Sequence, residues 1–239
     1  MEILYEDNHI IVVSKPQGVA SQPDETGDKD ILTQVKEYIK EKYNKPGDAF
    51  VGLVHRMDRP VGGLLVFART SKAASRLSEQ VRTHELCREY VCVSEGSAPD
   101  RFTLRDWLQK DESTNMVKVL PPYLKLQGKE AILHGRNVAN RSNHCLCCIR
   151  LETGRAHQIR VQMQNAGHAL WGDNRYGHGK RGQQIALWGM RLSLKHPITG
   201  ENMVFISPVP DDKPWLWFER ELRGLETIWP QIKPAAQMD

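Results

Sequence analysis

The chain is 239 residues long, 40% hydrophobic and 26% charged, with a formal net charge of +4. A chain of this size and composition can bury its own hydrophobic core, which excludes a disordered, collagen-like or coiled-coil protein. No apolar run approaches the ~20 residues that a membrane-spanning helix needs, and the acidic start MEILYEDNHI lacks the layout of a signal peptide. We therefore expect a cytoplasmic protein with no membrane partner.

Short apolar runs predict strands along the whole chain, and two stretches have helical periodicity. The predicted strands are residues 10–13, 64–68, 90–93, 144–151, 186–194 and 203–206, with strand-like residues also at 159–163. Asp30 is placed to cap a helix that ends near Tyr43, and Thr70 or Ser71 is placed to cap a second helix. Because strands dominate without a regular βα alternation, we expect an α+β fold with a mixed, mostly antiparallel central sheet and peripheral helices.

The chain has no internal repeat and no low-complexity linker. We therefore expect a single domain over residues 1–230, followed by a frayed tail at 231–239. Three tryptophans near the end of the chain predict that the segment before the tail packs back on the body of the protein. They are Trp215, Trp217 and Trp229.

The five cysteines are an odd number, which argues against a secreted disulfide framework. Three of them, Cys145, Cys147 and Cys148, crowd one short segment without a second ligand pair, so buried thiols are expected rather than a metal site. The chain also lacks the glycine-rich motifs that bind phosphate after a strand, and we expect no nucleotide cofactor.

Positive charge concentrates between residues 136 and 191. This window holds nine basic residues against two acidic ones, whereas the rest of the chain holds 24 basic and 27 acidic residues. Eight of the nine are arginines, whose planar guanidinium suits phosphate. Such a field attracts polyanions, nucleic acid above all, although a solvated basic face remains the alternative.

The densest group of ionisable residues is HRMDRPVGG at 55–63, directly before the predicted buried strand at 64–68. Arg56 and Arg59 flank Asp58, so their field keeps its carboxylate ionised and could hold it poised as a nucleophile. The alternative is that Asp58 only satisfies turn amides while the arginines point to solvent.

Two further stretches carry candidate functional groups. The alternation of Ile159 and Val161 in TGRAHQIRVQ (153–162) predicts a strand with one buried face. Arg160 in that strand either pairs with a buried carboxylate or phosphate, or lies exposed. Tyr90, at the start of another predicted strand, either stacks on a base or belongs to the core.

These stretches, in this order, resemble the RluA-type family of RNA pseudouridine synthases. The likeness runs from about residue 3 to 210 and covers five motifs. The first three are ILYEDNHIIVVSKPQGV at 3–19, HRMDRP at 55–60 followed by GLLVFA at 63–68, and REY at 88–90. The fourth is TGRAHQIR at 153–160, followed by GH at 167–168, GD at 172–173 and YG at 176–177. The fifth is HPITG at 196–200, followed by PVP at 208–210. Because the first motif begins at residue 3, we expect no N-terminal RNA-binding extension, and RNA recognition falls to the catalytic domain.

The resemblance implies a role for each matching residue. Asp58 would be the catalytic aspartate, Arg56 would fill the space left by a flipped-out uridine, and Tyr90 would stack on the target base. Arg160 would pair with Asp58 and fix its orientation. Further RNA contacts are expected from Arg59, Arg155, His157 and Gln158.

The resemblance also implies the setting of the reaction. The expected fold has a central RNA-binding cleft, and the expected partner is a structured RNA, either transfer RNA or ribosomal RNA. Isomerising uridine to pseudouridine requires no cofactor and no metal, and we expect the protein to act as a monomer.

The chain departs from the family at a few positions. Val61 and Gly62 stand where the family often has Thr-Ser, and Leu187-Trp188-Gly189 stands where it has Leu-His-Ala. These changes concern fine substrate contacts and leave Asp58 untouched.

Two other functions are open on the sequence. One is a non-catalytic RNA-binding or RNA-folding protein on the same scaffold, which would keep its effect when Asp58 is replaced. The other is a hydrolase or nuclease that uses His55 or His157, which would shorten its RNA.

Overall fold

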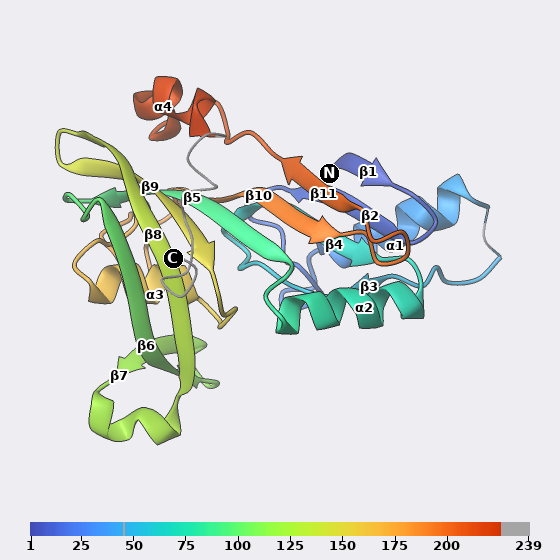
Figure 1. Cartoon of the computed structure of the whole chain (residues 1–239), viewed down its shortest axis with the longest axis horizontal. Helices are drawn as coiled ribbons and strands as arrows, with labels where there is room; N and C mark the ends of the chain where they lie inside the picture. The colour runs from blue at the N-terminus through green and yellow to red at the C-terminus, as the bar shows by residue number, and fades with distance from the viewer. Residues whose placement is uncertain (45, 226–239) are drawn as a thin grey trace. The chain divides into compact units, whose positions relative to one another are not determined.

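The computed structural model describes residues 1–44 and 46–225, and within them the chain divides into two compact units (Figure 1). Unit 1 consists of residues 1–88 and 188–208, and unit 2 of residues 89–187 and 209–225. The single domain over 1–230 stays a prediction. The expected tail at 231–239 lies outside the described residues.

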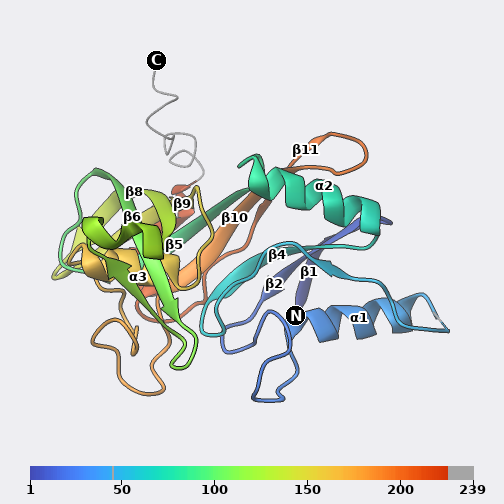
Figure 2. The same cartoon turned by 90° about the horizontal axis from the view of Figure 1, so that it is seen from below.

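Unit 1 is a mixed sheet with helices packed on it. Its strands follow the order β1 (Glu2–Glu6), β2 (Ile10–Lys15), β4 (Gly62–Ala68) and β10 (Leu187–Lys195), with β3 (Gly52–Leu53) paired to β4 and β11 (Asn202–Ile206) paired to β10. The pairs are antiparallel except for β4 with β10, which run parallel. Helices α1 (Ile31–Lys42) and α2 (Ser71–Arg82) lie on opposite sides of β1, β2 and β4 (Figure 2).

The local sequence explains why these elements form where they do. The Asp30 carboxylate accepts a hydrogen bond from the Thr33 N–H at 3.0 Å, and the Thr70 hydroxyl accepts one from the Ala73 N–H at 3.1 Å, so both predicted caps are confirmed. Every residue of β2 and β4 is buried. Strands buried on both faces give unbroken apolar runs instead of alternating ones.

The core of unit 1 lies between α2 and one face of these strands. Ile10 and Val12 of β2, and Leu64 and Val66 of β4, pack in one cluster with Leu77 of α2. The alternate residues of β2 and β4 belong to the opposite face, because successive side chains in a strand point to opposite sides.

Two glycines let β4 lie directly beside β10. A Cβ atom on Gly62 would come within 2.1 Å of the Trp188 indole, and one on Gly63 within 2.3 Å of the Gly189 carbonyl oxygen. Gly63 also has a φ of +121°, which other residues rarely adopt. The glycine pair that follows Pro60 in the sequence is therefore a requirement of the sheet as well as of the turn.

Unit 2 is built from a sheet with one longer helix. Its strands follow the order β5 (Cys87–Glu95), β9 (His144–Leu151), β8 (Lys129–Arg141), β6 (Arg101–Asp111) and β7 (Met116–Leu120), with the short helix η1 (Pro122–Gln127) between β7 and β8. The pairs β9 with β8, β8 with β6 and β6 with β7 are all antiparallel. The mixed, mostly antiparallel α+β architecture expected from the sequence is thus confirmed.

Helix α3 (Gln158–Asn165) corrects the strand predicted at 159–163. Residues 158–163 are buried at every position, so the alternation of Ile159 and Val161 does not mark a single buried face. The chain enters the helix through His157, whose φ is +52°. Val161 then packs with apolar residues of the neighbouring strands, namely Leu108, Val117 and Ala131.

The last described segment, with η2 (Trp215–Phe218) and α4 (Glu219–Arg223), belongs to unit 2. Trp215 is buried, and the Trp217 ring lies 5.0 Å from the His144 ring and 6.0 Å from the Trp171 ring. The predicted packing of this segment is confirmed for these two tryptophans, while Trp229 lies outside the described residues.

Strand β9 holds the predicted buried thiols. The side chains of Cys145, Cys147 and Cys148 have no solvent exposure, and they are free thiols. Burial raises the pKa of Cys148 well above its usual value. These cysteines therefore behave as small core residues.

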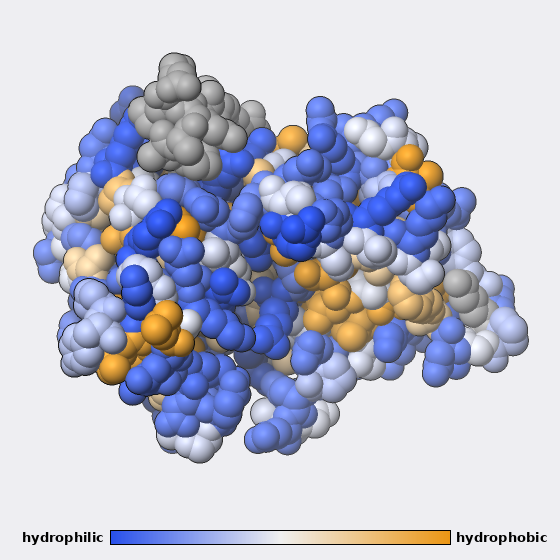
Figure 3. Space-filling view, turned by 60° about the horizontal axis from the view of Figure 1, so that its bottom comes forward, coloured by the Kyte–Doolittle hydropathy of each residue, from blue (hydrophilic) through white to orange (hydrophobic). Residues whose placement is uncertain are grey.

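The surface shown in Figure 3 is mostly hydrophilic, with apolar residues in separate small areas. The large apolar side chains that are exposed include Tyr123 and Leu126 of η1, with 83% and 94% of their surface accessible. Scattered exposed apolar residues are ordinary for a globular protein.

Candidate active site

Asp58 lies in an irregular segment, residues 54–61, that joins β3 to β4. Met57 exchanges two hydrogen bonds with the Ser21 hydroxyl, at 2.7 Å through its carbonyl oxygen and 3.0 Å through its N–H. The Val61 N–H closes a turn by donating to the Asp58 carbonyl oxygen at 3.0 Å. Asp58 is half-buried, so a carboxylate is held at the start of a buried strand by a well-anchored turn.

The residues before Asp58 differ in their surroundings. Arg56 is exposed. His55 is buried, and its Nε2 accepts a hydrogen bond from the Val66 N–H at 3.2 Å. Burial, with the positive charge of Arg88, lowers the pKa of His55 to about 3. His55 is therefore a neutral side chain near pH 7 that accepts a hydrogen bond through Nε2.

Lys15, at the end of β2, is a buried amine beside the Asp58 segment. Its Nζ donates to the carbonyl oxygens of Pro16, Val19 and Arg59 at 3.1, 2.6 and 3.2 Å. Burial lowers the pKa of Lys15 to about 7, the charge of Asp58 raises it, and that of Arg59 lowers it. Sequence analysis missed this residue, although a lysine that directly follows the buried run IIVVS is a signal of a partnered buried charge.

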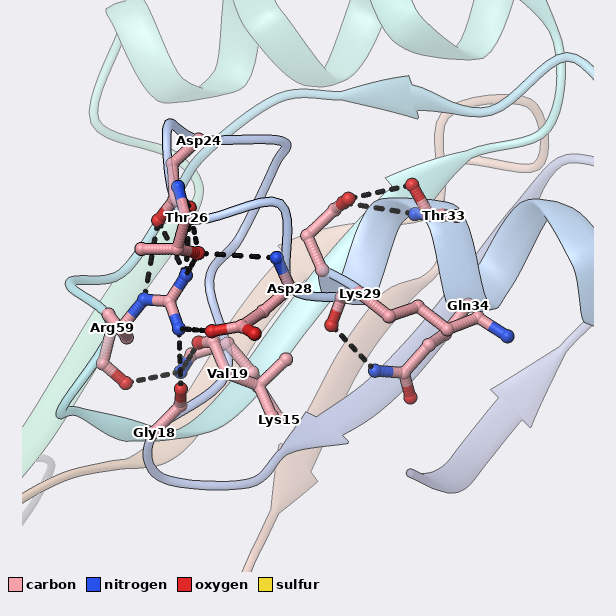
Figure 4. A network of polar contacts seen from close by, with 11 residues as sticks. Lys15, Gly18, Val19, Asp24, Thr26, Asp28, Lys29, Thr33, Gln34 and Arg59 are labelled. Carbon is pink, nitrogen blue, oxygen red and sulfur yellow. Dashed lines mark hydrogen bonds and ion pairs between the residues drawn. The ribbon is translucent and has the colours of Figure 1, made fainter.

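Arg59 turns its guanidinium into the loop at residues 18–28 (Figure 4). It donates to both carboxylate oxygens of Asp24, each 2.8 Å from the same nitrogen, and to Asp28 at 2.7 Å. It also donates to the Thr26 hydroxyl and to the Gly18 carbonyl oxygen. The hydrogen bonds from Arg59 lower the pKa of Asp24 to about 2.

In unit 2, two of the predicted residues are buried. Tyr90 lies in β5 with 6% of its surface exposed. Arg160 lies in α3, and its Nε and one terminal nitrogen donate to the two carboxylate oxygens of Asp173, both at 2.8 Å. The predicted buried carboxylate partner of Arg160 is thus Asp173, and the pairing of Arg160 with Asp58 stays a prediction. Asp173 was not singled out from the sequence.

The other predicted RNA contacts of unit 2 gather at the start of α3. Arg155 is exposed, and its Nε donates to the Glu130 carbonyl oxygen at 2.7 Å. The His157 Nδ1 lies 2.7 Å from the Tyr176 hydroxyl. Gln158 is 3% exposed, and its side-chain amide binds Thr153, the Arg155 N–H and the Ile132 carbonyl oxygen. With those contacts the Gln158 side chain stabilises the start of α3. A contact of Gln158 with RNA stays a prediction.

No three His, Cys, Asp or Glu side chains in the described ranges lie close enough together to hold a metal ion. None of the described helices is long and apolar enough to span a membrane.

Comparisons with known proteins agree on one family. The family model described as RNA pseudouridylate synthase matches residues 9–165. The chain is 34% identical over 217 residues to the "Uncharacterized RNA pseudouridine synthase YhcT" of Bacillus subtilis, a match that covers 89% of this chain and 70% of that protein. It is 32% identical over 227 residues to the "Ribosomal large subunit pseudouridine synthase D" of Haemophilus influenzae, covering 89% and 68%.

Solved structures show the same fold. The human RNA pseudouridylate synthase domain containing 4 superposes with a TM-score of 0.72 at 18% identity, covering 94% of this chain and 93% of the human chain. The human RNA pseudouridylate synthase domain containing 1 gives a TM-score of 0.68, also at 18% identity, covering 93% and 94%.

Proposed function

The chain belongs to the family of RNA pseudouridine synthases, and from this premise we propose that Asp58 is the nucleophile with which it isomerises uridine in a structured RNA. The observation that carries the proposal is the setting of Asp58. The turn that carries its carboxylate is anchored by hydrogen bonds of Met57 and Val61, and the carboxylate interacts electrostatically with the buried amine of Lys15.

The reaction needs only groups that the chain supplies. The bond between N1 of the base and C1′ of the sugar breaks, the base rotates, and a bond between C5 and C1′ forms, while the proton leaves C5 and N1 gains one. In the proposed reaction the Asp58 carboxylate attacks C1′; the alternative is that it assists formation of a glycal. Nothing is oxidised, and no group enters from another molecule.

The proposal gives the other residues supporting roles. Arg56, which is exposed, takes the place of the uridine that leaves the helix. Tyr90 stacks on the target base, and Arg160 orients Asp58. Arg155 and His157 contact the RNA beside the site. The protein acts as a monomer in the cytoplasm.

The substrate class follows from the relatives. The name of the Haemophilus influenzae relative refers to the large ribosomal subunit. We therefore place large-subunit ribosomal RNA first among the candidate substrates and transfer RNA second.

The test is pseudouridine-specific chemical mapping of total RNA from cells with and without the gene, followed by assays on transcribed fragments that contain the mapped sites. Replacing Asp58 with Asn should slow isomerisation by at least about 10⁴-fold, because no nucleophile remains, while RNA binding persists. The matched control is Asp100→Asn, at an exposed aspartate of unit 2, which should retain full activity. Turnover by Asp58→Asn at the wild-type rate would refute the role of Asp58. RNA binding by the wild-type protein without any isomerisation would favour the non-catalytic alternative.

A further inference from the structure

The loop at residues 18–28 holds the chain on both sides of Asp58. On one side, the Ser21 hydroxyl and Met57 exchange two hydrogen bonds. On the other side, the Gly18 N–H donates to the Arg59 carbonyl oxygen at 2.9 Å, and Lys15 donates to the same oxygen. A displacement of this loop would therefore move the main chain that carries the Asp58 carboxylate.

The Arg59 side chain supplies the ionic part of this attachment. Two carboxylates, Asp24 and Asp28, receive its N–H groups, and all three side chains are partly exposed, at 29% for Arg59, 38% for Asp24 and 69% for Asp28. With two negative charges around one positive charge, the cluster carries a net negative charge. A phosphate approaching Arg59 would meet that repulsion and would have to displace hydrogen bonds that are already made.

We propose that Arg59 is a positioning residue for the isomerisation: through Asp24 and Asp28 it fastens loop 18–28 against the Asp58 segment, and it does not bind RNA phosphate. The proposal rests on the proposed function, in which Asp58 is the nucleophile. It is an alternative to the RNA contact that the sequence predicted for Arg59.

The reason to expect an effect on rate is geometric. A nucleophile must be aligned with the atom that it attacks, and a misplacement of about 1 Å can cost a factor on the order of 10² in rate. The stability of the fold should depend less on the Arg59 cluster than the reaction rate does, because β2 and β4 are buried along their whole length and do not need the cluster for this burial.

The experiment compares Arg59→Ala, Arg59→Lys and Asp24→Asn in single-turnover assays with enzyme in excess, alongside RNA binding at several salt concentrations. We expect Arg59→Ala and Asp24→Asn each to lower the rate constant about 10- to 100-fold, with unchanged Kd and unchanged salt dependence. Arg59→Lys should recover part of the rate, because an ammonium can reach one carboxylate but cannot reproduce the forked contact. The double variant Arg59→Ala/Asp24→Asn should be no slower than Arg59→Ala alone, because Arg59→Ala already removes the contact with Asp24.

The matched control is the exposed pair of Arg82 with Glu79 on α2 of the same unit. Arg82→Ala and Glu79→Gln should leave the rate and the Kd unchanged. Thermal unfolding of each variant confirms that the protein assayed is folded.

Asp24→Asn decides between the two roles of Arg59. If Arg59 bound phosphate, removing the Asp24 charge would strengthen RNA binding and leave the rate intact, while Arg59→Ala would weaken binding and reduce the salt slope by about 1. Either result would overturn the positioning role. Failure of the proposed function looks different: Asp58→Asn would then remain active, whatever the Arg59 variants do.

Discussion

Arg160 and Asp173 form an ion pair that is almost entirely removed from solvent, with 5% and 1% of their side chains exposed. Burial alone would raise the pKa of Asp173, but the hydrogen bond and charge of Arg160, with the N–H groups of Arg175 and Tyr176, outweigh it and hold the pKa below its usual value. The Arg160 guanidinium also lies 5.1 Å from the centre of the Tyr176 ring. Because little water reaches either side chain, the two charged groups stabilise each other in place of solvent.

This pair changes what a substitution of Arg160 reports. Arg160→Met should lower the free energy of unfolding by about 3–5 kcal/mol, because it leaves the Asp173 carboxylate buried without its partner. Chemical denaturation measures the loss, and the double variant Arg160→Met/Asp173→Leu should recover most of it, because an apolar pair leaves no buried charge. A single variant as stable as the wild type would show that the pair contributes nothing to the fold. A loss of activity in Arg160→Met can be assigned to Asp58 only once this instability is accounted for.

Single residues were predictable from the sequence when the signal was local. Asp58, Arg56 and Arg59 stand together in one motif, and the structure places them in one anchored segment. The buried charges Asp173, in unit 2, and Lys15, in unit 1, were missed, because a charged side chain acquires its buried partner through tertiary folding and not through spacing along the chain.

At the scale of elements, the sequence predicted the strands that carry an unbroken apolar run, including the partly exposed β11, and missed others, including β8, whose residues 131–135 are buried. β2 and β4 are apolar throughout and stand out in the sequence. β6 mixes exposed and half-buried residues along its length, and both β6 and β7 were overlooked. Alternations such as Phe102 with Leu104 and Val117 with Val119 were the available signal.

Two departures from the family pattern meet in one contact. Gly62 stands where the family often has serine, and Trp188 stands where it has histidine. In the parallel pair of β4 and β10 these residues lie side by side, and the Trp188 ring fills the space that a Cβ on Gly62 would occupy. The large Trp188 side chain on β10 therefore fits because Gly62 on β4 has no side chain.

The two positions should be energetically coupled. Gly62→Ser should destabilise the protein by about 1–3 kcal/mol, because the serine would be forced into the Trp188 ring. Adding Trp188→His should relieve that strain, so the double variant should be more stable than the sum of the single effects by about 0.5–3 kcal/mol. Denaturant titration of the four proteins completes the cycle, and strictly additive effects would disprove the compensation.

At the scale of the whole molecule, the positive charge found in the sequence falls mainly in one unit. Of the nine basic residues between 136 and 191, all except Arg191 belong to unit 2. Arg160 is buried in its ion pair, whereas Arg141, Arg155, Arg175, Lys180 and Arg181 are exposed. Unit 2 therefore presents a group of exposed cationic side chains, of which Arg141 is paired with Glu221.

RNA affinity should accordingly fall steeply with salt, because each phosphate contact releases bound counterions. Lys180→Gln/Arg181→Gln should weaken binding and reduce the slope of log Kd against log salt concentration by about 1–2, while the single-turnover rate at saturating enzyme stays unchanged. The control Lys40→Gln/Lys72→Gln removes two exposed charges from unit 1 and should leave the slope as it is. A response to salt that is flat in the wild type would contradict the role of the basic window.

The division into two units had no counterpart in the sequence. Such a boundary is commonly marked by a flexible linker, and the chain has no low-complexity segment at 88–89 or 187–188. The chain crosses between the units twice inside strands, in β5 and β10, and a third time after β11, at 208–209. The two crossings inside strands depend on long-range packing that local composition does not record.

The route of the chain through unit 1 has a consequence for its synthesis. β4 leaves the ribosome early, but β10, the strand that covers Gly62 and Gly63, follows only after residues 89–187 have been made. Until then the nascent protein carries an open strand edge flanked by apolar residues, which is a site for mispairing with another chain. A later, C-terminal part of the chain thus completes the N-terminal unit, and a chain interrupted before residue 188 would leave that edge uncovered.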